Sequence, residues 1–440
     1  MSSPPPIQPV SSAQATTRAG VLRDRERPFR LLWIAFLVSG LGWGFTMPLF
    51  PVIIVESGIP VKTYGLLQTF AAAATVLTQV FIGRYSDRLG RRKPLVVGTL
   101  LALAPVVLLF PHVKVAIAFG FLLACHQVAM NAYRAMTAAW ISAWATPSTL
   151  GRLHGTFRMA ASLGWIAATP LLGFLLDRYG YPSTFGLAAA IYFGTALFVG
   201  AAIADGAGQS ARPPGTTDAA KLQAPSRPRL PGDVEARLHL RPLLPFFAAL
   251  STFYVSQVMG QSLNAIYLTQ TVGVSRAQFG WLTSMQAWFE VPLMLLLGAM
   301  MDRFNPARIV TLGFALTGLR WFAFATVSDP LWLVPVQWLH AIGVTVGEVL
   351  AVAYITKRVP QEALGVAVGV KMAVQNAAGL IAPALGGQLV HVTGMEQTLK
   401  VAAALSFAAA LLMAGEALFT RRPSAGAPPR TARRFRHTPR

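Results

Sequence analysis

The sequence has few charged residues and a single cysteine. Asp, Glu, Lys and Arg make up 12% of the 440 residues, whereas soluble globular domains carry about 25%. This scarcity excludes an ordinary soluble enzyme and a disordered chain. The lone Cys125 excludes a disulfide framework and a metal site built from several cysteines. Hydrophobic residues are abundant instead, at 54%, which indicates a polytopic membrane protein.

Twelve apolar segments are each long enough to cross a bilayer as a helix. A spanning helix needs about 20 apolar residues, and its backbone must satisfy its own hydrogen bonds inside the bilayer. The sequence therefore predicts an all-α membrane protein with 12 transmembrane helices. The predicted spans are residues 31–55, 64–83, 95–111, 115–137, 153–175, 183–203, 243–268, 278–300, 309–327, 331–354, 362–387 and 398–420.

Basic residues outnumber acidic residues by 37 to 16, which gives a net charge of +21. In a soluble protein this excess would suggest a nucleic-acid partner, but cytoplasmic loops of membrane proteins also collect Lys and Arg. If the N-terminus is cytoplasmic, five basic residues lie in external segments and four within spans, which leaves 28 of the 37 on the cytoplasmic side. We therefore expect both termini in the cytoplasm and no nucleic-acid partner.

One long polar stretch, rich in proline, separates the first six spans from the last six. We interpret this stretch as a cytoplasmic linker. The predicted organisation is a cytoplasmic N-terminal tail at 1–30, a six-helix bundle at 31–203, the linker at 204–242, a second six-helix bundle at 243–420 and a basic cytoplasmic tail at 421–440.

The two halves of the chain are similar to each other. Residues 64–98 align with residues 279–313 without a gap, and a neighbouring offset pairs Arg134 with Glu348 and His126 with His340. Matches at polar positions in the same order are hard to obtain by chance. Two pseudo-symmetric halves of this kind are typical of secondary transporters.

The connection between the second and third predicted spans carries a basic, glycine-containing motif. It comprises Gly83, Asp87, Arg88, Gly90 and Arg91, and a degenerate copy recurs in the second half at Gly298, Asp302 and Arg303. The motif resembles the G-x-x-x-D-R-x-G-R-[RK]-[RK] loop of the major facilitator superfamily. The resemblance implies the two-bundle fold of that superfamily, with the loop holding the halves in one conformation. Gly83 is expected to allow a close helix approach.

The fifth predicted span carries a second pattern, formed by Gly155, Gly164, Pro170 and Gly173. It resembles the superfamily's antiporter motif, which would imply export against protons; the alternative is plain helix packing through small residues. The chain as a whole is similar to the bacterial sugar efflux transporters, on the segments 157–166, 251–253 and 288–294.

The resemblance implies proton-coupled export of sugars or related small polar solutes across the bacterial inner membrane. It implies a monomer that needs no cofactor, with the proton gradient as energy source and with lipid, protons and a small-molecule substrate as partners. A multidrug or antibiotic antiporter is the alternative within the superfamily. A membrane receptor or enzyme has no supporting motif in the sequence.

Ionisable residues inside spans are the candidates for proton coupling, because a charge at a helix centre costs about 2.5–3.5 kcal/mol. Arg134 and Glu348 could form a central pair that opens when the carboxylate takes up a proton, or a static ion pair. Glu290 is a second candidate proton carrier, or a structural partner of Arg158. Arg158 and Lys371 either neutralise these acids or extend to the membrane surface.

Polar side chains at helical spacing are the candidates for substrate binding. Amides inside a span are costly unless they line water or bind a solute, and interhelical contact is the alternative for about half of them. The candidates are Ser39, Trp43, Gln127, Asn131, Tyr254, Gln257, Gln261, Asn264 and Gln286. His126 and His340 are candidate proton relays, and the sequence favours the alternative, hydrogen-bonded packing between helices.

Overall fold

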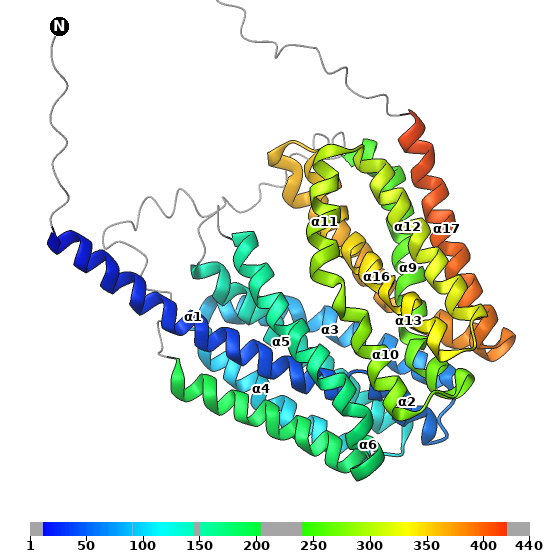
Figure 1. Ribbon diagram of the computed structural model, residues 1–440, viewed down its shortest axis with the longest axis horizontal. Coiled ribbons are helices and arrows are strands. Elements are labelled where there is room, and N and C mark those ends of the chain that lie inside the picture. Colours follow the sequence, from blue (N-terminus) through cyan, green and yellow to red (C-terminus); the bar gives the residue numbers. More distant parts are fainter. Residues whose placement is uncertain (1–11, 90, 145–149, 204–239, 420–440) are drawn as a thin grey trace, which may run out of the picture.

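The computed structural model describes residues 12–89, 91–144, 150–203 and 240–419 (Figure 1). Every regular element in these ranges is helical, which confirms the predicted all-α class. The side chains of 12–26, 80, 86–89, 143–144, 150–152, 361–362 and 417–419 lie outside the described part of the chain.

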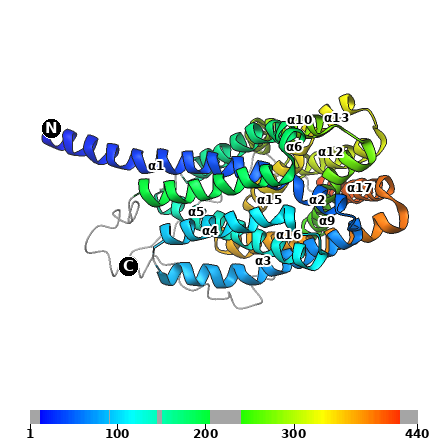
Figure 2. The same cartoon turned by 90° about the horizontal axis from the view of Figure 1, so that it is seen from below.

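The first half forms one bundle. Its elements are α1 (Ser12–Thr46), α2 (Leu49–Glu56), α3 (Val61–Leu89), α4 (Lys93–Leu109), η1 (Phe110–His112), α5 (Ala116–Trp144) and α6 (Leu150–Ala202). Helix α1 begins well before the predicted span, and its first turns extend beyond the bundle (Figure 2). Helices α1 and α2 together make the first span.

Helix α6 contains two spans rather than one. Its apolar stretch Leu153–Ala202 holds 50 residues, which at 1.5 Å per residue is more than twice the hydrocarbon thickness of a bilayer. Gly180 has φ 72° and ψ −176°, a conformation that favours glycine, and the chain turns back there (Figure 1). The 11 helical stretches that are long and apolar enough to span a membrane therefore correspond to 12 transmembrane helices.

The second half forms the other bundle. Its elements are η2 (Arg241–Leu243), α9 (Leu244–Ile266), η3 (Tyr267–Val272), α10 (Arg276–Trp288), α11 (Glu290–Arg303), α12 (Pro306–Thr326), α13 (Pro330–Trp338), α14 (His340–Thr345), η4 (Val346–Leu350), α15 (Ala351–Thr356), α16 (Gln361–Thr393) and α17 (Met395–Phe419).

Two spans of the second bundle are interrupted, although the sequence predicted continuous helices over 278–300 and 331–354. The eighth span breaks at Phe289 (φ −101°, ψ 2°). Pro292 explains this break, because a proline lacks the N–H that would bond the carbonyl four residues earlier and clashes with that carbonyl. The tenth span breaks at Leu339 and then includes the π-helical turn Val346–Leu350.

The two bundles meet at the end that carries α2, α10 and α13 and diverge toward the opposite end, where α6 ends and η2 begins (Figure 1). We call the end where the bundles meet the closed end. Across the bundles α3 packs on α16, α6 on α10, and α2 on α9. The Oγ atom of Ser284 donates to the carbonyl of Ile166 at 3.0 Å, and Nε1 of Trp165 donates to the carbonyl of Thr283 at 3.3 Å.

Candidate functional site

Glu290 lies between the two bundles, at the first residue of α11. Its Oε2 atom is 3.5 Å from Nη2 of Arg158 and accepts a hydrogen bond from Oγ of Ser162 at 3.4 Å, and both partners belong to α6. Its Oε1 atom is 3.9 Å from Nε2 of His340, the first residue of α14. The Glu290 side chain is 12% exposed. A single buried carboxylate therefore contacts both halves of the protein.

Breaks in two helices position this cluster. Glu290 directly follows the break at Phe289, and His340 directly follows the break at Leu339. Interrupted helices in membrane proteins are tolerated where the backbone is buried in protein or lines a cavity. The Arg158–Glu290 contact is one of the two alternatives that the sequence offered, while proton transfer at Glu290 stays a prediction.

Arg134 and Glu348 are both exposed, and no ion pair within 4.0 Å joins these two described residues. The guanidinium of Arg134 instead lies 4.7 Å from the centre of the Trp43 ring. Trp43 packs edge-on against Trp165, with ring centres 4.8 Å apart. The charges of Arg158, Glu348 and Glu290 act on Arg134 at longer range. The charged residues that the sequence predicted for the centre therefore do lie in one region between the bundles.

Glu348 lies in the π-helical turn of the tenth span, an irregularity that is frequent at functional sites. The hydroxyl of Tyr254 donates to the carbonyl of Gly347 in this turn at 3.1 Å. Lys371 is buried, donates to Oε1 of Gln375 at 3.0 Å and lies 5.7 Å from the centre of the Tyr254 ring.

The predicted amide face of the seventh span connects to the eighth and ninth spans. Nε2 of Gln261 donates to Oε1 of Gln286 at 3.3 Å, and Nη2 of the fully buried Arg320 donates to Oε1 of Gln261 at 3.3 Å. Gln261 itself is exposed. Buried amide oxygens of Gln257 and Asn264 have no hydrogen-bond partner among the described residues, so this face keeps unused hydrogen-bonding capacity.

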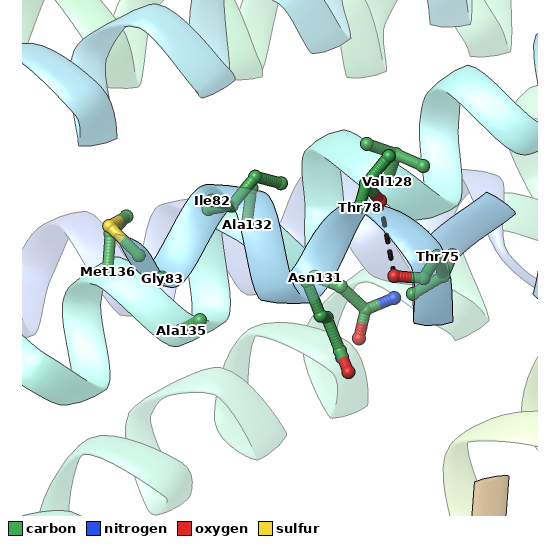
Figure 3. Close-up of a pocket in the computed structure, with 10 residues that line it drawn as sticks. Thr75, Thr78, Ile82, Gly83, Val128, Asn131, Ala132, Ala135 and Met136 are labelled. Atoms are coloured by element: carbon green, nitrogen blue, oxygen red, sulfur yellow. Dashed lines mark hydrogen bonds between the residues drawn. The ribbon is translucent and has the colours of Figure 1, made fainter. Parts of the chain in front are cut away.

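Polar candidates of the first bundle are divided between packing and a small pocket. Ser39 is buried, and its Oγ atom lies 2.9 Å from the hydroxyl of Tyr133, which joins α1 to α5. Asn131 lines a pocket between α3 and α5 (Figure 3). Its amide nitrogen donates to the carbonyl of Gln127 at 2.8 Å. The other polar residues of this pocket are Thr75, Thr78 and Gln79, which are not among the substrate-binding candidates that the sequence indicated.

The basic motif is only partly described. Gly90 and the side chains of Asp87 and Arg88 lie outside the described residues, and Arg91 is exposed. No described atom lies within 4 Å of a Cβ built at Gly83, so the predicted close helix approach at this glycine is wrong for this structure.

In the degenerate copy, Asp302 pairs with Lys357 at 2.9 Å, and Arg303 is exposed. No described atom lies near a Cβ built at Gly298 except a methyl group of Val349 at 3.7 Å, an ordinary contact.

The glycines of the fifth span differ in their surroundings. A Cβ at Gly164 would lie 2.8 Å from the α1 backbone at Gly40, and a Cβ at Gly173 would lie 2.7 Å from Cα of Ala277 in α10. A Cβ at Gly155 would have no described atom within 4 Å. Pro170 lies inside α6, and the adjacent Thr169 carbonyl faces Gly280 of α10. Two of the three glycines therefore serve close helix packing.

The repeat-related histidines have different environments. His126 packs edge-on against Phe50 with ring centres 4.7 Å apart, and neither of its ring nitrogens has a hydrogen-bond partner in the described ranges. The hydrogen-bonded packing proposed for His126 is therefore absent, whereas His340 faces Glu290.

Sequence reasoning missed Ser162 and the contact of Arg320 with Gln261. The sequence did hold a signal for a contact of Arg320: this basic residue lies inside a predicted span that contains no acidic residue.

The sequence profile of the Major Facilitator Superfamily matches residues 32–262 and 245–439. A putative sugar efflux transporter of Deinococcus radiodurans is 29% identical over 275 residues, which cover 60% of this chain and 66% of that protein. Sugar efflux transporter A of Dickeya chrysanthemi is 23% identical over 92% of this chain and 98% of its own length.

Two further similarities bear on the fold and the cargo. The class E tetracycline resistance protein of Escherichia coli is 25% identical over 81% of this chain and 86% of its own length. The crystal structure of a D323A mutant of the nucleoside transporter NupG superposes with a TM-score of 0.71 at 15% identity, covering 88% of this chain and 99% of that chain. Twelve spans in two repeated bundles and a profile match over most of the chain lead to one conclusion: the chain belongs to the Major Facilitator Superfamily and is a transporter rather than an enzyme.

Proposed function

We propose that this transporter exports sugars or related small polar solutes in exchange for protons, by alternating access across the bacterial inner membrane. The observation that carries the proposal is the position of Glu290, a buried carboxylate held by Arg158 of one bundle and facing His340 of the other. The similarity to two sugar efflux proteins supports the class of cargo.

Protonation of Glu290 would remove its charge and with it the attraction to Arg158. A neutral carboxyl can still accept a hydrogen bond from the Ser162 hydroxyl and can still face the His340 ring. The proton would therefore weaken the Arg158–Glu290 contact between the bundles and leave the Glu290–His340 contact within the second bundle. A change in one charge at a junction between two rigid bodies is the kind of event that biases a two-state transition.

Polar recognition of the solute would come from Gln261 and Trp43. Gln261 is exposed while Arg320 and Gln286 hold its amide from both sides, so its orientation is set before a solute arrives. Trp43 is half-buried and presents a ring beside Arg134. Aromatic rings and oriented amides are suited to the apolar faces and hydroxyl groups of a sugar.

Transport in proteoliposomes with an imposed pH gradient tests the proposal. Vesicles are loaded with labelled galactose or lactose, and the outside is made more acidic than the inside. We compare the parent with Glu290→Gln, with Glu348→Gln and with Glu396→Gln, which removes an exposed carboxylate from α17 outside the site. The parent and Glu396→Gln should show faster efflux under the gradient, while efflux through Glu290→Gln should ignore it. A full gradient response in Glu290→Gln would refute the role of this residue.

Export of an antibiotic or another lipophilic compound is the second candidate, because one relative is named as a tetracycline resistance protein. The same vesicles loaded with tetracycline or ethidium distinguish the two. Gradient-driven movement of these compounds without movement of either sugar would replace the first proposal by the second.

A further inference from the structure

Six charged side chains of the described spans act on one another as one electrostatic network, and the network is not neutral. The cations are Arg134, Arg158, Arg320 and Lys371, and the anions are Glu290 and Glu348. Four cations against two carboxylates leave two positive charges when His340 is neutral. Each proton taken up by a carboxylate increases this excess.

Three of the four cations already have partners. Arg158 contacts Glu290, the buried Lys371 donates to Gln375, and the fully buried Arg320 donates to Gln261. Arg134 differs from them, because it is exposed and no described acid lies within 4.0 Å of it. The charged groups that act on it are Arg158, Glu348 and Glu290.

Trp43 gives Arg134 a defined place. The ring lies 4.7 Å from the guanidinium carbon and is itself packed against Trp165. A guanidinium stacked on an aromatic ring keeps its N–H groups free at the edge of its plane. These groups match the two oxygens of a carboxylate in a bidentate contact.

We propose that the preferred cargo is an acidic sugar or a similar carboxylated polar solute, and that Arg134, held on Trp43, binds its carboxylate. This inference rests on the proposed sugar export and narrows its substrate class. Uncompensated positive charge within a membrane protein is costly, and a solute with one negative charge lowers that cost when it enters between the bundles. A neutral sugar of the same size offers only its hydroxyl groups.

Galactose and galacturonate test the inference, because they share one pyranose ring and differ by the carboxylate. Efflux of each labelled compound is measured in proteoliposomes for the parent and for Arg134→Gln, Arg134→Lys and Arg308→Gln. The last variant removes an exposed arginine of α12 that is outside the network. Thermal unfolding of each purified variant reports whether it is folded.

The parent and Arg308→Gln should move galacturonate at least about tenfold more efficiently than galactose, a factor typical of one charge-assisted contact. Arg134→Gln should remove this preference whatever its effect on galactose efflux, and Arg134→Lys should keep part of the preference. If Arg134→Gln moves neither compound, binding measured by intrinsic tryptophan fluorescence should still show the loss confined to galacturonate.

Two results would overturn the inference. One is galactose efflux equal to or faster than galacturonate efflux in the parent, which would leave the proposed sugar export intact. The other is an acidic preference that persists in Arg134→Gln, which would remove Arg134 from recognition. Movement of tetracycline or ethidium alone would overturn the sugar proposal and this inference together.

Discussion

A single added methyl group at Gly173 should push the bundles apart at the closed end. The Cβ of Gly173→Ala would lie 2.7 Å from Cα of Ala277 and 2.8 Å from the carbonyl carbon of Arg276. These atoms are backbone of α10, which cannot turn aside as a flexible side chain can. Carbon atoms in contact are separated by about 3.5–4.0 Å, so α6 and α10 would have to separate by roughly 0.8 Å or more.

Gly155→Ala is a matched control within the same helix. A methyl group there meets no described atom within 4 Å, and both substitutions gain the helix preference of Ala over Gly, about 0.5–1 kcal/mol. The difference between the two variants therefore isolates the α6–α10 contact. Overpacking of this kind costs typically about 1–3 kcal/mol, which shifts a two-state equilibrium by about 5- to 150-fold.

Electron–electron distance measurement on spin labels detects the shift. Labels are placed at Arg178→Cys in the first half and Gln270→Cys in the second, both exposed positions near the closed end, after Cys125→Ala. Gly173→Ala should increase the population of longer distances, and Gly155→Ala should match the parent. Identical distance distributions and identical galactose efflux in the two variants would refute the argument that this contact holds the bundles together.

Three further predictions concern other parts of the protein. His126→Phe should leave gradient-driven efflux and thermal stability near the parent values, because its ring nitrogens bond no described group, whereas His340→Phe should impair the gradient response; equal effects would show that His340 has no special role. Tyr254→Phe should lower the thermal unfolding temperature by leaving the Gly347 carbonyl without its partner, a loss of about 1–3 kcal/mol, whereas Tyr179→Phe, at a 57% exposed residue, should not; an unchanged Tyr254→Phe would contradict this. Asp302→Asn should cost at most about 1 kcal/mol in denaturant unfolding, because the Asp302 side chain in the Lys357 pair is 78% exposed; a larger loss would mean that this pair joins the helices more strongly than its exposure implies.

The spans could be predicted from the sequence because each needs only length and apolar composition, and these are local properties. The interruptions of the eighth and tenth spans were harder to predict. Pro292 was a visible signal for the break at Phe289, but the turn at Leu339 and the π-helical turn after it depend on how the tenth span packs against its neighbours. These irregularities position Glu290, His340 and Glu348, so the candidate site depends on backbone that is harder to predict than the regular spans around it.

The charged candidates illustrate the same limit. The sequence offered two roles for Glu290, proton carrier or structural partner of Arg158, and Arg158 contacts it in the structure. The repeat placed Arg134 and Glu348 at equivalent positions in the two bundles. A pseudo-symmetry axis along the membrane normal gives such residues the same depth in the membrane, but it does not set the distance between them. In the structure the two side chains are not in contact. The Arg320–Gln261–Gln286 chain joins three spans, and no periodicity within one span reveals which residues of its neighbours it will meet.

The repeat that relates the two bundles has lost its symmetry at the residues proposed to couple protons to transport. Glu348 corresponds to Arg134, Glu290 corresponds to Thr75, and His340 faces an acid where His126 faces phenylalanine. A tandem of two first halves would therefore have twelve spans but neither of these carboxylates, and a tandem of two second halves would lack both Arg134 and Arg158. The halves are complementary parts, and a chain assembled from one of them twice could not couple a proton to its cargo through these groups.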